Sequence, residues 1–425
     1  MTVRPGAPVT FAVAAASCEP LIIVGPEEAW ANLQATCRWW QAWSGSLQLD
    51  LGRWQQPVTR SLITLRLLTY APAGAPVAAP TTSLPEVIGG SRNWDYRYAW
   101  PRDAGIGIAA FLGAGRPEEA RAFLYWLLHA TRLYRPRLPA LLTLDGRHVP
   151  AERLLDWPGY AGSRPVRVGN NARDQHQLDG YGCLGRGLGS SRRRSPVVRR
   201  NVARTQWFRR PGCRPVDGAG QRHLGGAGSA EALRALEADG LVGVGPGSAH
   251  CRSASHVGAP MRALAARPGR DRGQRPHQRG RPAPGLPGAC VRKSRTGRGA
   301  AATSGAGVHY SRRPLLARTV AAIREDLSDG GELVYRYPQG SDGLPGAEGP
   351  FLPCSFWLVQ ALARIGQVDE ASELFDRLLA RAGPMGLFSE EVDPTTDQQI
   401  GNYPQAFTHA TLVQAALALR DATAG

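Results

Sequence analysis

Apolar residues recur with helical spacing over several long stretches of this chain. The stretch Glu27–Trp43 carries Trp30, Leu33, Cys37 and Trp40 at intervals that place them on one side of a helix. Such spacing predicts an amphipathic helix, since successive turns then present apolar groups to the same neighbour. The same spacing predicts five further helices, at Thr59–Tyr70, Pro117–Leu133, Ser355–Ile365, Val368–Ala382 and Gln405–Ala422.

Turn and strand signals complete this pattern. Gly366 separates two of the predicted helices, and Asp369 stands near the start of the second, so these two helices are expected to form a hairpin. Near the N-terminus, the β-branched segments Thr10–Val13 and Leu21–Val24 predict short strands. Paired helices joined by long polar, aromatic loops indicate an all-α barrel or solenoid in which the loops carry the functional site.

The pattern breaks down between residues 183 and 310. This segment is rich in Arg, Gly, Pro, Ala and Ser, and it holds one Trp of the chain's eleven. It contains 23 Arg and one Lys against five acidic residues, a net charge of +19, whereas the whole chain carries +17. By composition the segment is predicted to be disordered. A structureless insert of this length inside a compact domain is abnormal and needs an explanation.

Composition also bears on the class of protein. A length of 425 residues suggests roughly two to three domains. The seven Cys contain no C-x-x-C pair, so neither a disulfide framework nor a metal site is predicted. No run is apolar enough to span a membrane, and the stretch that ends at Cys18 is too short for a lipoprotein signal. We therefore expect a cytoplasmic protein that does not act on membranes.

The segment Gly89–Asp103 is the densest chemical motif, with two Trp, two Tyr, three Arg and two Asp. Aromatic rings stack on the C–H faces of sugars, while carboxylates and guanidinium groups bond their hydroxyls. On composition alone, an aromatic core patch with surface charges is an equal alternative. Four further blocks favour a sugar site: Thr143–Asn171, Asp174–Gly182, Glu348–Trp357 and Leu387–Gln405.

Together and in this order, the blocks resemble the bacterial glucoamylase and trehalase group of family 15 glycoside hydrolases. The resemblance covers about residues 27–182 and 312–423. It implies an (α/α)6 barrel, incomplete here, that cleaves α-glucosidic bonds with inversion and needs no cofactor. It also implies four segments: the remnant of an N-terminal β-sandwich domain at 1–25, barrel parts at 26–182 and 312–425, and the anomalous segment at 183–311.

Inverting hydrolysis needs two carboxyl groups on opposite sides of the scissile bond, roughly 6.5–9.5 Å apart. One protonates the leaving oxygen, and the other, ionised, takes a proton from the attacking water. By the match to F-S-E-E-V-D-P, Glu390 takes the position of the general base. Glu391 is the reserve candidate, because the sequence alone does not separate the two. A solvated loop is the usual interpretation of such a pair, but Phe388, Asn402 and Tyr403 nearby favour a site.

The same resemblance implies the residues that hold the sugar. Arg102 and Asp103 would bind the hydroxyls of the non-reducing glucose, and Trp94, Trp100 and Trp157 would be sugar-facing platforms or the packing behind them.

Three further positions are less determined. Arg164 and Arg167 either line the substrate channel or are surface arginines, with equal weight on both alternatives. Pro101 stands where relatives carry an apolar residue. It is expected to disfavour helix at the residue before it and to shift the backbone of the two residues after it.

The general acid has no counterpart in the chain. The family places it in a W-E motif that would fall inside segment 183–311, where Glu231 and Glu237 have no matching context. Read one base later, codons compatible with His223–Gly243 can encode T-W-E-V-R-G-P-P-R-H-F-V-H-S-K-L-M-G-W-W, which is similar to the missing block. We infer that about 183–311 is translated out of frame, which would also explain its positive charge.

Three functions follow from these observations. The first is an α-glucoside hydrolase, impaired or inactive in this chain, that acts on trehalose or the ends of α-glucans. The second is a carbohydrate-binding protein without catalysis. The third, nucleic-acid binding through the Arg-rich segment, is disfavoured because Trp207 and Phe208 stand almost alone among its basic residues. Salt-dependent adhesion to RNA without sequence specificity is still expected of such a segment.

Overall fold

The computed structural model describes residue 6 and residues 9–16, 20–134, 137–175, 177, 180, 313–341, 344 and 346–424. The predictions made for 183–311, including its disorder and the lack of a general acid at Glu231 or Glu237, lie outside these described residues.

Helices make up most of the described regular structure. The helices of more than one or two turns are α1 Pro26–Gly45, α2 Gln55–Leu67, α3 Pro101–Gly113, α4 Pro117–Leu133, α8 Arg313–Leu327, α9 Leu352–Ile365, α10 Val368–Ala380 and α11 Ala406–Thr423. Short 3-10 turns lie at η1 Gly52–Trp54, η2 Tyr160–Gly162 and η3 Asn171–Asp174. The strands form two-stranded antiparallel pairs: β1 Thr69–Tyr70 with β2 Ala75–Pro76, β3 Arg153–Leu155 with β4 Val166–Val168, and β5 Glu391–Val392 with β6 Gln399–Ile400.

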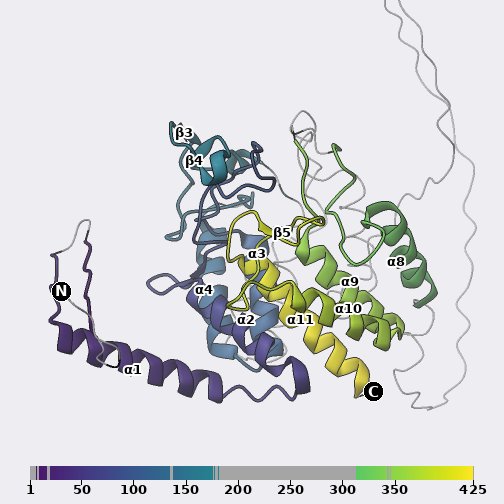
Figure 1. Cartoon of the computed structure of the whole chain (residues 1–425), viewed down its shortest axis with the longest axis horizontal. Helices are drawn as coiled ribbons and strands as arrows, with labels where there is room; N and C mark the ends of the chain where they lie inside the picture. The colour runs from purple at the N-terminus through teal and green to yellow at the C-terminus, as the bar shows by residue number, and fades with distance from the viewer. Residues whose placement is uncertain are drawn as a thin grey trace, which may run out of the picture.

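Helix α11 occupies the middle of the described domain (Figure 1) and packs against α2, α3 and α9. Its apolar residues are buried around most of its circumference, with Leu412, Val413 and Ala416 fully inaccessible. Two helical hairpins, α3–α4 and α9–α10, pack on it through α3, α9 and α10. The all-α class predicted from the sequence pattern is therefore confirmed. The family resemblance implies hairpins of this kind as the units of the barrel.

Close packing inside the first hairpin depends on a glycine. Phe111 of α3 and Phe123 of α4 meet edge to face with ring centroids 5.4 Å apart. A Cβ at Gly107 would lie 2.7 Å from Cε2 of Phe123, so a larger residue there would force the helices apart. Edge-to-face pairs contribute about 0.5–1.5 kcal/mol beyond their burial.

Several helix predictions are confirmed, and their ends have clear causes. Helix α4 runs from Pro117 to Leu133 as predicted, and α9 ends at Gly366, which adopts a left-handed conformation with φ of 93°. Helix α9 begins at Leu352, three residues before the predicted start, because Pro353 fits the first turn, where no intrahelical N–H bond is lost. Helix α2 ends at Leu67, before the predicted end at Tyr70. Thr69 and Tyr70 instead form a short strand that pairs with Ala75–Pro76.

The predictions for the N-terminal segment were wrong in part. Thr10–Val13 and Leu21–Val24 form no strands in the structure, where Val13 is 96% exposed. A strand needs a partner for its backbone groups, and these segments pair with no described residue. Helix α1 forms where predicted, but it buries no side chain fully, and Figure 1 shows much of it projecting from the body.

Two helices were not predicted from the sequence, α8 and α3. Helix α3 begins at Pro101, directly after Trp100, whose backbone is extended with φ of −99° and ψ of 125°. The expectation that Pro101 disfavours helix at Trp100 is confirmed. Because proline fits the first helical position, it starts a helix here and places Arg102 and Asp103 in its first turn. An acidic residue there is also stabilised by the helix dipole.

Candidate active site

Glu390 lies in the turn between Ser389 and strand β5, and its residue is only 4% exposed. Its backbone carbonyl accepts a hydrogen bond of 3.0 Å from the N–H of Leu352 at the start of α9. Close approach on another side is allowed by Gly401, where a Cβ would lie 3.4 Å from the Cβ of Glu390. The segments around Leu352 and Gly401 thus contact Glu390 from two sides.

The Glu390 carboxyl group has one hydrogen-bonded and one unbonded oxygen. The phenol of Tyr96 donates a hydrogen bond of 3.1 Å to Oε1. Oε2 is buried and has no hydrogen-bond partner among the described residues. Burial raises the pKa of Glu390 to about 7, even though Arg336 and the bond from Tyr96 lower it. A carboxyl group with this pKa can lose and take up a proton near neutrality.

This environment differs from one expectation. As the general base, Glu390 was expected to be ionised. The structure instead buries the carboxyl group, and burial disfavours the charged form.

Arg102 and Asp103 form an ion pair at the start of α3, with Arg102 Nε 2.7 Å from Asp103 Oδ1. Both side chains are largely buried, with exposures of 12% and 5%. The guanidinium of Arg102 lies over the ring of Phe407 at 4.9 Å and is close enough to Glu390 to lower its pKa. The structure therefore brings the predicted base and the two predicted glucose-binding residues into one site.

Trp100 and Trp94 occupy different environments near this site. Trp100 is buried and meets Tyr96 edge to face at 5.4 Å, so it packs behind the residue that holds the base. Trp94 is partly exposed, and the guanidinium of Arg167 lies 4.7 Å from its ring centroid. Arg167 also pairs with Glu152 at 2.9 Å, so this arginine is a packed residue rather than a surface one.

Two of the predicted sugar-binding residues are largely exposed. Trp157 is 63% exposed, and the Arg164 side chain is 61% exposed in a pair with Asp156 at 3.2 Å. The described structure thus does not join them to Glu390. Of the two alternatives left open for Arg164, its exposure favours the surface arginine.

Helix α11 and the residue before it hold the turn that carries the base. The N–H of Phe388 donates to His409 Nε2 at 3.2 Å, and the hydroxyl of Thr408 donates to the carbonyl of Ser389 at 2.8 Å. The N–H of Gln405 donates to the carbonyl of Phe388 at 2.9 Å. Because these bonds are buried, each loss would leave a polar group without a partner, which costs about 1–3 kcal/mol.

Three other glutamates adjoin the base. One carboxylate oxygen from each of Glu86, Glu348 and Glu391 lies within 4.8 Å of the others. Glu348 is paired with Arg92 at 3.2 Å, and Glu391 Oε2 accepts from the N–H of Gly349 at 2.8 Å. Burial, with the negative neighbours, raises the pKa values of both Glu86 and Glu391 well above their usual range. Because Glu348 already pairs with Arg92 and Glu391 already accepts from Gly349, we describe these residues as a carboxyl cluster and not as a cation site.

Sequence reasoning assigned no role to several of these residues. Tyr96 lies within the aromatic motif that was recognised, but the pattern could not tell it from Tyr98. Arg336 is surrounded by the carboxyl groups of Glu348 and Glu390, which raise its pKa although burial alone would lower it. Its only sequence signal is its position shortly before the block Glu348–Trp357.

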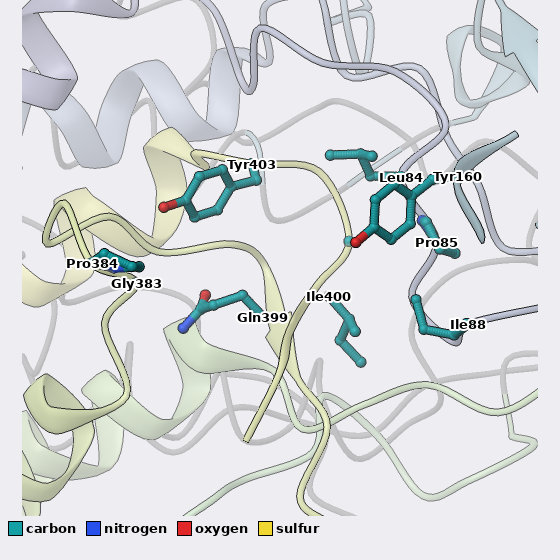
Figure 2. Close-up of a pocket in the computed structure, with 10 residues that line it drawn as sticks. Leu84, Pro85, Ile88, Tyr160, Gly383, Pro384, Gln399, Ile400 and Tyr403 are labelled. Atoms are coloured by element: carbon teal, nitrogen blue, oxygen red, sulfur yellow. The ribbon is translucent and has the colours of Figure 1, made fainter. Parts of the chain in front are cut away.

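A cavity of about 280 Å³ adjoins the base turn (Figure 2). Its lining is mainly apolar, with the rings of Tyr160 and Tyr403 at its edges. Gln399 also lines it, but its side-chain amide already accepts from the N–H of Ser389 at 2.7 Å and donates to the carbonyl of Arg381 at 2.6 Å. Neither Glu390 nor Arg102 lines the cavity, so it is a neighbour of the site and does not present the base.

Residues 52–185 and 300–417 match the sequence profile of the family described as Glycosyl hydrolases family 15. The interval between these two matches falls within segment 183–311, where the helical pattern breaks down. No helix among the described residues is long and apolar enough to cross a membrane.

Individual relatives align over most of the chain. A trehalase of Mycolicibacterium smegmatis is 34% identical over 410 residues, which are 92% of this chain and 59% of that protein. A trehalase of Thermoplasma volcanium is 30% identical over 412 residues, covering 93% of this chain and 63% of that protein. The chain thus spans about three fifths of the length of these relatives. A solved structure described as "Glycosidase Wild Type" aligns with a TM-score of 0.43 and 16% identity, covering 88% of this chain and 98% of that one.

Proposed function

The chain belongs to glycosyl hydrolases family 15, and from this premise we propose that its described residues form the glucose-binding and general-base side of an enzyme that hydrolyses α-glucosidic bonds with inversion. The observation that carries the proposal is the buried Glu390, bonded to Tyr96 and adjacent to the Arg102–Asp103 pair.

In this proposal Glu390 activates the attacking water. Its Oε1 is held by Tyr96, so Oε2 is the oxygen that accepts the proton of the water. The pKa of the Glu390 carboxyl group is about 7, because the positive charge of Arg336 partly offsets the increase caused by burial. General-base catalysis of this type contributes roughly 10²–10⁴-fold to the rate.

Arg102 and Asp103 are proposed to bind the hydroxyl groups of the terminal glucose. A carboxylate accepts hydrogen bonds from hydroxyls, and a guanidinium donates them in a fixed plane, so the pair can orient a sugar ring. Their low exposure makes these bonds worth more than they would be in open water, since the pair is already desolvated.

The general acid is the missing part of the mechanism. An inverting enzyme needs a second carboxyl group roughly 6.5–9.5 Å from the base, with the scissile bond between them. We propose that this group is encoded in the other reading frame of codons for 183–311, and that the chain as written therefore releases no glucose. A chain with the frame restored would supply the acid and the remaining barrel helices.

We further propose trehalose as the substrate, because the relatives that align with most of this chain are trehalases. The ends of α-glucans are the alternative substrate. A cytoplasmic location belongs to the same proposal. It is consistent with the free thiols of Cys37 and Cys354, since unpaired cysteines persist in a reducing compartment.

The test compares the chain as written with a chain in which the frame of 183–311 is restored. The restored chain should hydrolyse trehalose to one β-glucose and one α-glucose, because inversion changes only the glucosyl half; proton NMR during the first turnovers detects both anomers. Two α-glucose molecules would contradict inversion. Clear turnover by the chain as written would contradict the frame inference.

A carbohydrate-binding protein without catalysis is the second candidate function. The observation that favours it is the intact Arg102–Asp103 pair, which does not depend on a general acid. Calorimetric binding of trehalose to both chains, with turnover in neither, would support this candidate over the hydrolase.

A further inference from the structure

Glu86 and Glu391 lie in a buried region where carboxyl groups outnumber arginines. Glu86 is 3% exposed and Glu391 is 1% exposed, and each has a carboxylate oxygen within 4.8 Å of the other and of Glu348. The base Glu390 is close enough to both to raise their pKa values. Like charges this close, away from water, destabilise one another strongly, so some of these groups must be neutral.

The positive groups among the described residues do not balance the cluster. Nη1 of Arg92 lies 3.2 Å from Oε1 of Glu348 and 4.0 Å from Oε2 of Glu86. Arg336 interacts most strongly with Glu348, and the phenol of Tyr337 donates to Glu348 Oε1 at 2.5 Å. Both the cation and the hydrogen-bond donor stabilise a negative charge on Glu348.

Glu86 and Glu391 have fewer groups near them that stabilise a negative charge. Glu391 Oε2 accepts one neutral hydrogen bond, from the N–H of Gly349 at 2.8 Å. Glu86 Oε2 is buried without a hydrogen-bond partner among the described residues. A third ion pair, Arg102 with Asp103, already uses the remaining arginine beside the base. Five carboxyl groups thus lie beside three arginines in this part of the described structure, so the described acidic groups outnumber the described cations.

We propose that Glu86 and Glu391 are neutral carboxylic acids at neutral pH, and that Glu391 is a positioning residue that holds the Gly349 segment beside Glu390 rather than a second base. The positioning role rests on the proposed function of Glu390, whereas the protonation of the two residues does not. An uncharged Glu391 cannot take a proton from water, so this assignment separates the two adjacent glutamates that the sequence left open.

A direct test uses carbon-13 NMR of the whole chain, with the glutamate carboxyl groups labelled. At about one pH unit above the midpoint of Glu390, two glutamate signals should still have the chemical shift of a protonated acid. Glu86→Gln and Glu391→Gln should each remove one of these signals, whereas the matched variant Glu348→Gln should remove the signal of an ionised group. Removal of ionised signals by the first two variants would overturn the proposal.

The titration of Glu390 provides a second readout, because its midpoint depends on whether Glu391 carries a charge. Glutamine replaces a neutral acid without changing charge, so Glu391→Gln should leave the Glu390 midpoint almost unchanged. If Glu391 were ionised, removing its charge would lower that midpoint by about one unit or more. The two substitutions at Glu391 should also differ in their effect on the Glu390 midpoint. Glu391→Gln keeps an acceptor for the Gly349 N–H and should preserve the midpoint, whereas Glu391→Leu loses this acceptor and should not.

These outcomes are independent of turnover. If either variant fails to fold, the labelled native chain still decides the question through the number of protonated glutamate signals. A native spectrum with every buried glutamate ionised would overturn the proposal and leave the proposed hydrolase untouched. Absence of trehalose binding or hydrolysis would contradict the proposed function and leave the protonation result standing.

Discussion

The phenol of Tyr96 donates a 3.1 Å hydrogen bond to Oε1 of Glu390, joining residues 294 positions apart in the sequence. Tyr96 belongs to the aromatic motif before α3, and Glu390 belongs to the turn before β5. Their contact links the aromatic motif to the proposed base. In the proposed mechanism it leaves Oε2 as the oxygen that meets the attacking water, so residues from both halves of the described domain contribute to one site.

Replacing Tyr96 by Phe should raise the pKa of Glu390 above its value of about 7, because the phenol stabilises the ionised form and lowers that pKa. The measurement is an NMR titration of the Glu390 carboxyl group in the chain as written. In the frame-restored enzyme, the acid limb of the pH–rate profile should move to higher pH by the same amount.

Tyr98→Phe is the matched control, since it removes a phenol from the same motif without touching Glu390. A Glu390 midpoint that moves equally in both variants, or in neither, would contradict the role assigned to Tyr96.

Glu390→Gln should abolish glucose release by the frame-restored chain while leaving trehalose binding within a few-fold of the parent. The amide keeps the size of the carboxyl group and can still accept from Tyr96, but it cannot take a proton from water. Loss of a general base removes about 10²–10⁴-fold in rate. Initial rates and calorimetric affinities measured on the same preparation separate the two effects, and full activity in the variant would show that Glu390 is not the base.

Arg102→Lys should weaken trehalose binding by about tenfold or more, because a lysine ammonium cannot keep both the planar bonds to a sugar and the pairing with Asp103. Arg164→Lys is the control, since Arg164 is exposed and, among the described residues, pairs with the exposed Asp156. Isothermal calorimetry with trehalose compares the two. Equal losses would mean that Arg164, too, lines the substrate path.

Much of the helical framework could be predicted from sequence, because α4, α9 and α10 have clear apolar periodicity and breaks such as Gly366. Helix α3 could not, since its residues are apolar on most sides and periodicity disappears when a helix is buried all round. The N-terminal strands were wrong because β-branched composition does not supply a pairing partner.

The site divides in the same way. Glu390, Arg102 and Asp103 could be identified from sequence, since each lies in a continuous motif whose residue types and order are visible along the chain. The buried cluster was not predicted, because Glu86, Glu348 and Glu391 are far apart in sequence and meet only through tertiary packing. Trp157 fits the composition of a sugar platform, yet it is 63% exposed, because composition does not specify where a side chain points.

Gly401→Ala should reduce the free energy of unfolding by about 1 kcal/mol, because Gly401 has φ of 80°, a conformation that disfavours a side chain. It should also shift the Glu390 titration, since the new Cβ would lie 3.4 Å from the Cβ of Glu390. Gly366→Ala is the control: its φ of 93° imposes similar strain, but nothing lies within 4 Å of its Cβ position. Denaturant unfolding and the carboxyl titration measure the two effects, and a Glu390 shift in the control would contradict a local cause.

His409→Gln should make the protein less sensitive to acid. His409 is fully buried between the N–H of Phe388 and the hydroxyl of Ser61, 3.0 Å from its Nδ1. Burial lowers the pKa of His409 from its ordinary 6.5 to about 3. Between these values the unfolded chain binds a proton that the folded chain does not, so folding stability falls as the pH drops below 6.5. The loss attributable to His409 should reach about 2 kcal/mol near pH 5.

The carboxyl groups of Glu86, Glu390 and Glu391 act in the opposite direction, because their raised pKa values favour the folded state in mild acid and cost stability as the pH rises. The difference between parent and variant cancels these contributions. Denaturant unfolding at several pH values should therefore show a gap between the two proteins that changes by about 2 kcal/mol from pH 7 to pH 5 in favour of His409→Gln. His129→Gln, at an exposed histidine, is the matched control. A parallel pair of curves for the parent and His409→Gln would show that His409 is protonated as easily in the folded chain as in the unfolded one.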